Sequence, residues 1–368
     1  MISLAAATGR AGRRAFLRAP IDIYRDHPQH RDTERDIVET MLGGRSAFHR
    51  HAEVHPYLIR DGERLAGRVA LIHDRNLPDY AQVSFFEALP GLEGVIDTLR
   101  DKARELFQGV PKLVCGLDGH LNYSAGILIE GFEMPPVFGF NWNPLYYADY
   151  FAALHARTMV SFRFEIEPFC KLAERLATTN RRGNVVVRTM DRRQMRREVE
   201  IFSKLNNACF QEHAYWSDRT GEEDYELLRP FRFLLREENL IFAEVNGDPV
   251  GFLLWYPDFN EMVAPHGRLG LRHVCRYRLR KPANNSIQTV RLTEIGVRKE
   301  HRGSAVVPAM ILEMVTSLRA GPYRFCEGGF IFEENTSSIA LALSLIARAL
   351  GRRPLPARRW ATFEGDLQ

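Results

Sequence analysis

An apolar strand, a short basic turn and an amphipathic helix follow one another without a spacer in residues 294–318. The strand ends at Val297, and residues 298–304 form the turn. The helix then places six apolar side chains on one face: Val307, Met310, Ile311, Met314, Val315 and Leu318. Such a unit directs backbone N–H groups and the positive end of a helix at one spot. The segment therefore predicts an α/β architecture with a turn that suits a phosphate.

The second half of the chain continues this alternation. Asn246, Gly247 and Asp248 separate two apolar runs, at 240–245 and 250–256, which is a strong hairpin signal. We expect a strand at 184–189 and two helices before the hairpin. After it we expect strands at 287–297, 324–332 and 360–363, and helices at 304–318 and 337–350.

The first half repeats the hairpin at 57–74, around Asp61 and Gly62. We further expect strands at 82–86, 112–115 and 160–166, and helices at 92–107, 124–130 and 145–154. Self-similarity of this kind marks a repeated unit. The sequence therefore predicts an α/β (α+β) chain of two tandem domains, 1–170 and 184–368, with a boundary near 167–183. Each domain should hold a mixed, mostly antiparallel sheet flanked by helices.

Composition narrows the class of protein. Hydrophobic residues make up 45% of the chain and charged residues 26%, as in a soluble globular protein, and no apolar run approaches the roughly 18 residues of a membrane helix. We therefore expect a cytoplasmic protein. The five cysteines are scattered without Cys-x-x-Cys spacing, which argues against disulfides and against a metal site. A net charge of +4 suits phosphorylated cofactors, RNA or anionic membranes and selects none of them.

The turn carries a family resemblance. Val297, Arg302, Gly303, Ser304 and Ala305 resemble the acyl-CoA pyrophosphate loop of the GNAT acyltransferases, although Val307 replaces the last small residue. The order of elements in the second half is also similar to that of GNAT domains. The corresponding residues of the first half, 87–91, contain no Arg, so we expect the donor in the second domain.

Further short strings resemble the tandem GNAT group that includes bacterial ceramide synthase. They are Ile23, Tyr24 and Arg25; Gly67, Arg68 and Val69; Phe85, Phe86 and Glu87; Gly126, Ile127 and Leu128; Asn143, Pro144, Tyr146 and Tyr147; Pro257, Asp258 and Asn260; and Glu334 with Asn335. The resemblance implies N-acyl transfer from an activated donor to a small-molecule or lipid amine.

The donor class stays open at this point. The resemblance implies acyl-CoA or an acyl-carrier-protein thioester as co-substrate, with no tightly bound cofactor. Related tandem GNAT folds take an aminoacyl group from tRNA, so an aminoacyl-tRNA-dependent transferase is one alternative. A non-catalytic binding module on a decayed GNAT pair is another.

Two residues are candidates for catalysis. Acylation of an amine requires a base that removes a proton from an ammonium group, and Glu294 on the strand beside the expected thioester fits that role. The alternative for Glu294 is an ion pair with Arg291 or Arg298. The helix after Asn335 lacks the Tyr usual in GNAT domains, so Tyr147 is a candidate acid for the leaving thiolate.

The remaining candidates bind ligands. For the donor we expect the strand and turn residues Ile295, Val297, Arg302, Gly303, Ser304 and Ala305, together with Asn335. For the acceptor we expect Asn143, Tyr146, Asn260 and Trp216. The alternatives are structural: a solvated turn, a helix N-cap for Asn335, a turn role for Asn260, and core positions for the tyrosines.

A long segment, 260–286, interleaves six basic residues with apolar ones. It is compatible with an amphipathic lid, a peripheral membrane contact or an RNA-facing patch, and also with a solvated insertion.

Overall fold

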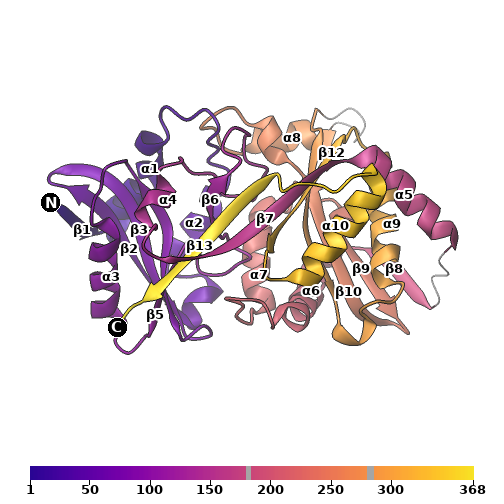
Figure 1. Ribbon diagram of the computed structural model, residues 1–368, viewed down its shortest axis with the longest axis horizontal. Coiled ribbons are helices and arrows are strands. Elements are labelled where there is room, and N and C mark those ends of the chain that lie inside the picture. Colours follow the sequence, from indigo (N-terminus) through magenta and orange to yellow (C-terminus); the bar gives the residue numbers. More distant parts are fainter. Residues whose placement is uncertain (180–183, 280–285) are drawn as a thin grey trace.

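One sheet runs through both halves of the chain (Figure 1). The computed structural model describes residues 1–179, 184–279 and 286–368. Its strands are β1 Ile2–Ala6, β2 Ala52–Asp61, β3 Arg64–Asp74, β4 Tyr80–Ala88, β5 Lys112–Cys115, β6 Ile127–Glu130, β7 His155–Glu165, β8 Val185–Thr189, β9 Leu240–Val245, β10 Asp248–Pro257, β11 Thr289–Val297, β12 Phe325–Phe332 and β13 Arg358–Asp366. Their order is β1-β2-β3-β4-β5-β13-β7-β12-β11-β10-β9-β8, with β6 paired to β13.

Helices pack on this sheet in both halves (Figure 1). They are α1 Gly9–Ile23, α2 Arg35–Leu42, α3 Val95–Leu106, α4 Tyr147–Tyr150, α5 Ile166–Thr179, α6 Met195–Phe210, α7 Gly221–Leu228, α8 Leu271–Leu279, α9 Val306–Arg319 and α10 Thr336–Leu350. None of the helices in the described ranges is long and apolar enough to cross a membrane.

The two halves share their central strands. The C-terminal strand β13 pairs with β5 of the first half, for example Phe363 with Cys115, and with β7 on its other side. The strand β7 in turn pairs with β12 of the second half. Phe363 accordingly lies in the first-half core, whereas Phe162 and Phe164 of β7 lie in the second-half core. The division into units 1–170 and 184–368 remains a prediction, and β13 crosses it.

Most predicted elements are present within a few residues of their expected bounds. The predicted helix at 124–130 is wrong, because Ile127–Glu130 is the strand β6, whose Leu128 pairs with Trp360. The helix expected at 145–154 is reduced to the short α4. The sequence-based assignment left out β1, α1, α2, α5 and α8. Residues 180–183 and 280–285, which include part of the predicted boundary and of the basic segment, lie outside the described residues.

Candidate active site

The strands β11 and β12 separate halfway along their length. Their parallel pairing covers Thr289–Leu292 against Phe325–Gly328 and ends there, although β11 continues to Val297. Beyond this point, within the described residues, β12 keeps only its pairing with β7 on the other edge, with Ile331 opposite Val160. The opening leaves the edge of β11 facing a cavity in the second half.

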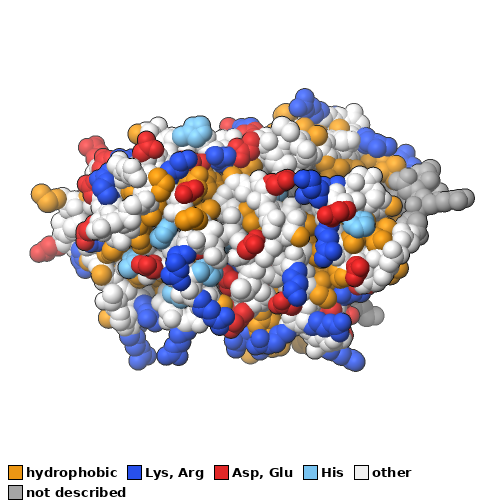
Figure 2. Space-filling model, turned by 90° about the horizontal axis from the view of Figure 1, so that it is seen from below, with side chains coloured by type: hydrophobic (Ala, Val, Ile, Leu, Met, Phe, Trp, Pro, Cys, Tyr) orange, Lys and Arg blue, Asp and Glu red, His pale blue; other side chains and the backbone are white. Residues whose placement is uncertain are grey.

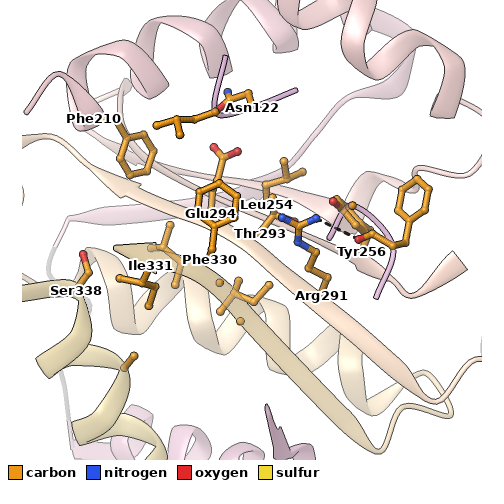
Figure 3. Close-up of a pocket in the computed structure, with 18 of the residues that line it drawn as sticks. Asn122, Phe210, Leu254, Tyr256, Arg291, Thr293, Glu294, Phe330, Ile331 and Ser338 are labelled. Atoms are coloured by element: carbon orange, nitrogen blue, oxygen red, sulfur yellow. Dashed lines mark hydrogen bonds between the residues drawn. The ribbon is translucent and has the colours of Figure 1, made fainter. Parts of the chain in front are cut away.

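A β-bulge sets which side chains face the opening. Glu294 lies opposite Leu254 of β10, but the next pair is Leu292 with Trp255, so Thr293 is an extra residue. Side chains alternate between the two faces of a strand, so residues three apart normally point to opposite faces. The extra residue shifts this alternation and places Arg291 and Glu294 on the same face. Figure 3 shows both side chains rising from β11, with the Glu294 carboxylate near Asn122 and the Arg291 guanidinium near Tyr256.

Glu294 has the surroundings of a base that works near neutral pH. Its Oε2 accepts a hydrogen bond of 2.6 Å from Asn206 Nδ2 of α6. Burial raises the pKa of Glu294 to about 7; the nearby Asp224 carboxylate adds to the rise, whereas the Asn206 bond and Arg291 oppose it. Within the described ranges Glu294 makes no ion pair with Arg291 or Arg298, and Asn206 is its hydrogen-bond partner.

The cavity beside Glu294 is mostly apolar and has a volume of about 310 Å³. Its walls come from α5, α6, α10, β10 and the separated strands, with Phe169, Phe210, Leu254, Phe330, Leu341 and Leu345 among them. Figure 3 shows Phe210, Phe330 and Ile331 around the carboxylate. Such walls suit an alkyl chain.

A groove of about 990 Å³ adjoins this cavity and ends at the predicted phosphate turn. The turn residues Val297, Arg302, Gly303, Ser304 and Ala305 line it, as does Ile295. The groove and the cavity share the wall residues Phe210, His213, Asn335, Leu341 and Leu345. The groove at the turn and the cavity at Glu294 are therefore neighbours along this shared wall.

The turn offers donors to an anion. Gly303 adopts φ +76°, a conformation that glycine reaches without strain. Within the described residues, the amides of Gly303, Ala305 and Val307 have no backbone acceptor, whereas the amide of Ser304 donates to His301 O. Arg302 donates through Nε to Val297 O (3.4 Å) and through Nη2 to Cys209 O (3.2 Å), which fixes the guanidinium at the turn. Three of its five N–H groups are not used by these two bonds.

Asn335 is the N-cap of α10, as the structural alternative predicted. Its Oδ1 accepts from the Ser338 amide (3.1 Å), and its Nδ2 lies 2.9 Å from Nε2 of His213. Burial lowers the pKa of His213. Asn335 and a neutral His213 therefore form a polar contact at the junction of groove and cavity.

The other end of the cavity is polar and lies between the two halves. Arg291 is 5% exposed, stacks on Phe140 at 4.0 Å and donates from Nη1 to Phe138 O (3.2 Å). Within residues 1–179, 184–279 and 286–368 its Nε has no hydrogen-bond partner, and the same holds for the indole N–H of Trp216, which also lines the cavity. Burial raises the pKa of Glu34, at the same end, to about 7.

The structure does not bring Tyr147 to Glu294. Tyr147 is buried in the first-half core, where its hydroxyl donates to Glu87 Oε2 (2.8 Å) and accepts from the Ala88 amide (3.0 Å). Tyr146 donates to Ala88 O (2.8 Å), and Tyr150 donates to Leu89 O. These tyrosines thus occupy the end of β4, the first-half counterpart of β11.

The pairing register explains why the first half has no base at the matching place. Ala88 lies opposite Gly67, as Val297 lies opposite Gly251. Three residues further along the partner strand, Ala70 lies opposite Ser84 as Leu254 lies opposite Glu294, so Ser84 takes the place of Glu294.

Asn143 and Asn260 also lie away from Glu294. Asn143 holds both backbone groups of Leu128, accepting from its amide (2.6 Å) and donating to its carbonyl (3.1 Å). Asn260 joins the halves, because its Oδ1 accepts from Thr33 (2.7 Å) and its Nδ2 donates to Pro136 O (3.0 Å). Of the four predicted acceptor residues, Trp216 alone lines the cavity.

Sequence reasoning missed Asn206 and the position of Arg291. Asn206 follows Phe202 by four residues and so lies on the apolar face of α6, where a polar side chain is a signal in itself. Arg291 depends on the bulge at Thr293, which strand periodicity alone does not reveal.

Comparisons with known proteins bear on the fold and on distant homology. No family model matches the chain. It is 24% identical over 231 residues to the protein YghO of Escherichia coli, covering 58% of this chain and 55% of that protein. It is 23% identical over 232 residues to bacterial ceramide synthase of Caulobacter vibrioides, covering 59% of each. The matches thus span little more than half the length of these relatives.

Solved structures match over the whole chain. A tandem GNAT protein from the clavulanic acid biosynthesis pathway superposes with a TM-score of 0.53 at 15% identity, covering 100% of this chain and 98% of that one. A probable N-acyltransferase from Enterococcus faecalis gives a TM-score of 0.54 at 8% identity, covering 100% and 73%. The chain therefore has the tandem GNAT fold, which confirms the predicted fold class, and is distantly homologous to ceramide synthase and YghO.

Proposed function

We propose that this protein is an N-acyltransferase that moves a long acyl chain from a thioester donor to an amine, with Glu294 as the general base. One observation carries the proposal. The groove at the Arg302 turn shares wall residues with an apolar cavity, and a carboxyl group with a pKa near 7 lines that cavity.

The donor follows the groove in this proposal. Its pyrophosphate binds the free amides of the turn and Arg302. Its amide-containing arm lies along the unpaired edge of β11 at Ile295 and Val297, as an added strand would. The acyl chain then fills the apolar cavity. An acyl-carrier-protein thioester has the same arm and would use the same edge.

In the proposed reaction a side chain of the protein transfers one proton. Glu294 takes a proton from the acceptor ammonium and passes it to solvent after the reaction. The neutral nitrogen attacks the thioester carbonyl, so that a C–N bond forms and the C–S bond breaks. The second amine proton goes to the departing thiolate, directly or through water. This route needs no tyrosine, in keeping with the distant position of Tyr147.

The acceptor enters from the polar end of the cavity. Its amine lies at Glu294, and Arg291 and Trp216 offer unused N–H donors to an oxygen of the acceptor. The distant homology to ceramide synthase, an enzyme named for a lipid product, supports a lipid amine.

The test is acyl transfer to a long-chain amine from palmitoyl-CoA and from acetyl-CoA, with direct binding of both donors and of free CoA by calorimetry. We expect turnover with palmitoyl-CoA and at least tenfold tighter binding of palmitoyl-CoA than of acetyl-CoA. Equal affinity for all three ligands would remove the cavity from donor binding. No binding and no turnover would contradict the proposal and direct the test to carrier-protein or aminoacyl-tRNA donors.

A further inference from the structure

The outward face of α8 combines exposed leucines with arginines. Leu271, Cys275 and Leu279 follow one another at a spacing of four and so form one ridge. Leu271 is 78% exposed and Leu279 is 86% exposed. At 100° per residue, Arg278 flanks the ridge on one side, and Arg272 and Arg276 flank it on the other.

The helix is nevertheless firmly packed. Its inward residues His273 and Tyr277 are buried, and the ring of Tyr277 contacts that of Phe259 at 5.4 Å. Arg236 donates from Nε to the Tyr277 hydroxyl (3.1 Å). Because the inward face of α8 is already packed against the protein, the helix holds the two leucines in solvent.

The charged side chains on the outward face of α8 are all basic. The helix α8 contains no acidic residue. Burial and the neighbouring guanidinium groups of Arg192 and Arg236 lower the pKa of Arg278, and Glu238 is the carboxylate that opposes this effect. The preceding Arg268 is held near three carboxylates of the first half, those of Asp32, Asp36 and Glu39. By contrast, acidic side chains lie among the basic ones on the face seen in Figure 2.

We propose that α8 docks this protein on an anionic lipid bilayer. The leucine ridge enters the acyl boundary, and the three arginines bind lipid phosphates beside it. The position of the helix fits this role, because Phe259, against which Tyr277 packs, lines the polar end of the cavity. Docking therefore sets that end of the cavity close to the lipid surface. The inference does not depend on the transferase reaction.

The test is flotation of the purified full chain with vesicles of phosphatidylcholine alone and of phosphatidylcholine with phosphatidylglycerol at 3:1. We expect binding to the anionic vesicles that weakens between 0.1 M and 0.5 M salt. The variant R272Q/R276Q/R278Q should bind roughly 100-fold more weakly. The variant L271N/L279N should lose at least about tenfold.

Matched controls separate this surface from general effects. The variant R100Q/K102Q/R104Q removes the same charge from α3 in the first half, and L145N removes a leucine that is 67% exposed. Both should bind as the wild type does. If the α8 and α3 variants lose vesicle binding equally, the binding depends on net charge alone, and the proposal is overturned. The proposal is also overturned if wild-type protein does not float, or if the α8 variants lose binding to an RNA oligonucleotide and not to vesicles.

Discussion

Replacing Glu294 by Gln should make the protein inactive and, above neutral pH, more stable. The Gln side-chain oxygen can still accept the hydrogen bond from Asn206, so the packing around α6 is retained. The base is lost, and general-base catalysis contributes about 10² to 10⁴ in rate. We therefore expect kcat to fall at least 100-fold while palmitoyl-CoA binding stays within about twofold of wild type.

The stability effect follows from the same pKa. The ordinary value for a glutamate here is 4.5, and burial raises the pKa of Glu294 to about 7. Because the folded state holds the proton more tightly, wild-type stability falls between these two pH values and stays lower above them. A difference of about 2.5 units corresponds to at most about 3 kcal/mol. The neutral Gln side chain carries no such penalty.

The measurement is urea unfolding of wild type and Glu294→Gln at pH 5 and at pH 8. Between pH 5 and pH 8, the free energy of unfolding of the variant should rise by about 1–3 kcal/mol relative to that of wild type. The control is Glu300→Gln on the exposed turn after β11, which should show no pH-dependent difference. A stability difference that is equal at both pH values would refute the raised pKa, and undiminished turnover would refute the role of Glu294 as base.

Further outcomes follow from the same geometry. In wild type, kcat/KM should rise tenfold per pH unit below about pH 7, the pKa of Glu294, and level off above it, as a pH–rate profile will show. Leu345→Trp at the junction of groove and cavity should weaken palmitoyl-CoA binding at least about tenfold and leave acetyl-CoA binding unchanged, because a large ring obstructs the longer chain alone. Tyr147→Phe should cost about 1–3 kcal/mol of stability, measured by urea unfolding, and leave kcat unchanged, since its hydroxyl serves Glu87 and Ala88. Arg291→Gln should raise the KM for the acceptor about tenfold without changing that for the donor, and a change in both would place Arg291 in the fold rather than at the acceptor.

The sequence predicted local elements well because their signals are local. The turn at Asn246 and Gly247 and the apolar face of α9 mark β9, β10 and α9 without reference to the rest of the chain. The segment at Ile127 failed because a short apolar run fits a helix and a strand equally, and its pairing with Trp360 of β13 decides the outcome.

The candidate site was predicted in part for the same reason. Glu294 and the Arg302 turn lie on one continuous strand and turn, so their proximity follows from the sequence. Asn143 and Tyr147 belong to a short string that resembles the tandem GNAT group, and such a string does not reveal which half of the protein its side chains serve. The orientation of Arg291 depends on a β-bulge, and the hydrogen bond from Asn206 to Glu294 depends on the packing of α6 on β11; neither can be read from the sequence.

The shared central strands have a consequence for how the chain acquires its structure during synthesis. A ribosome releases β5 long before β13, so the nascent first half presents an unpaired sheet edge until the last strand of the described chain emerges. The long interval between β5 and β13 also makes this contact costly in loop entropy and therefore late. Folding of the first half is accordingly completed only when β13 is available, and a nascent protein of this architecture depends on protection of that edge while the second half is still being made.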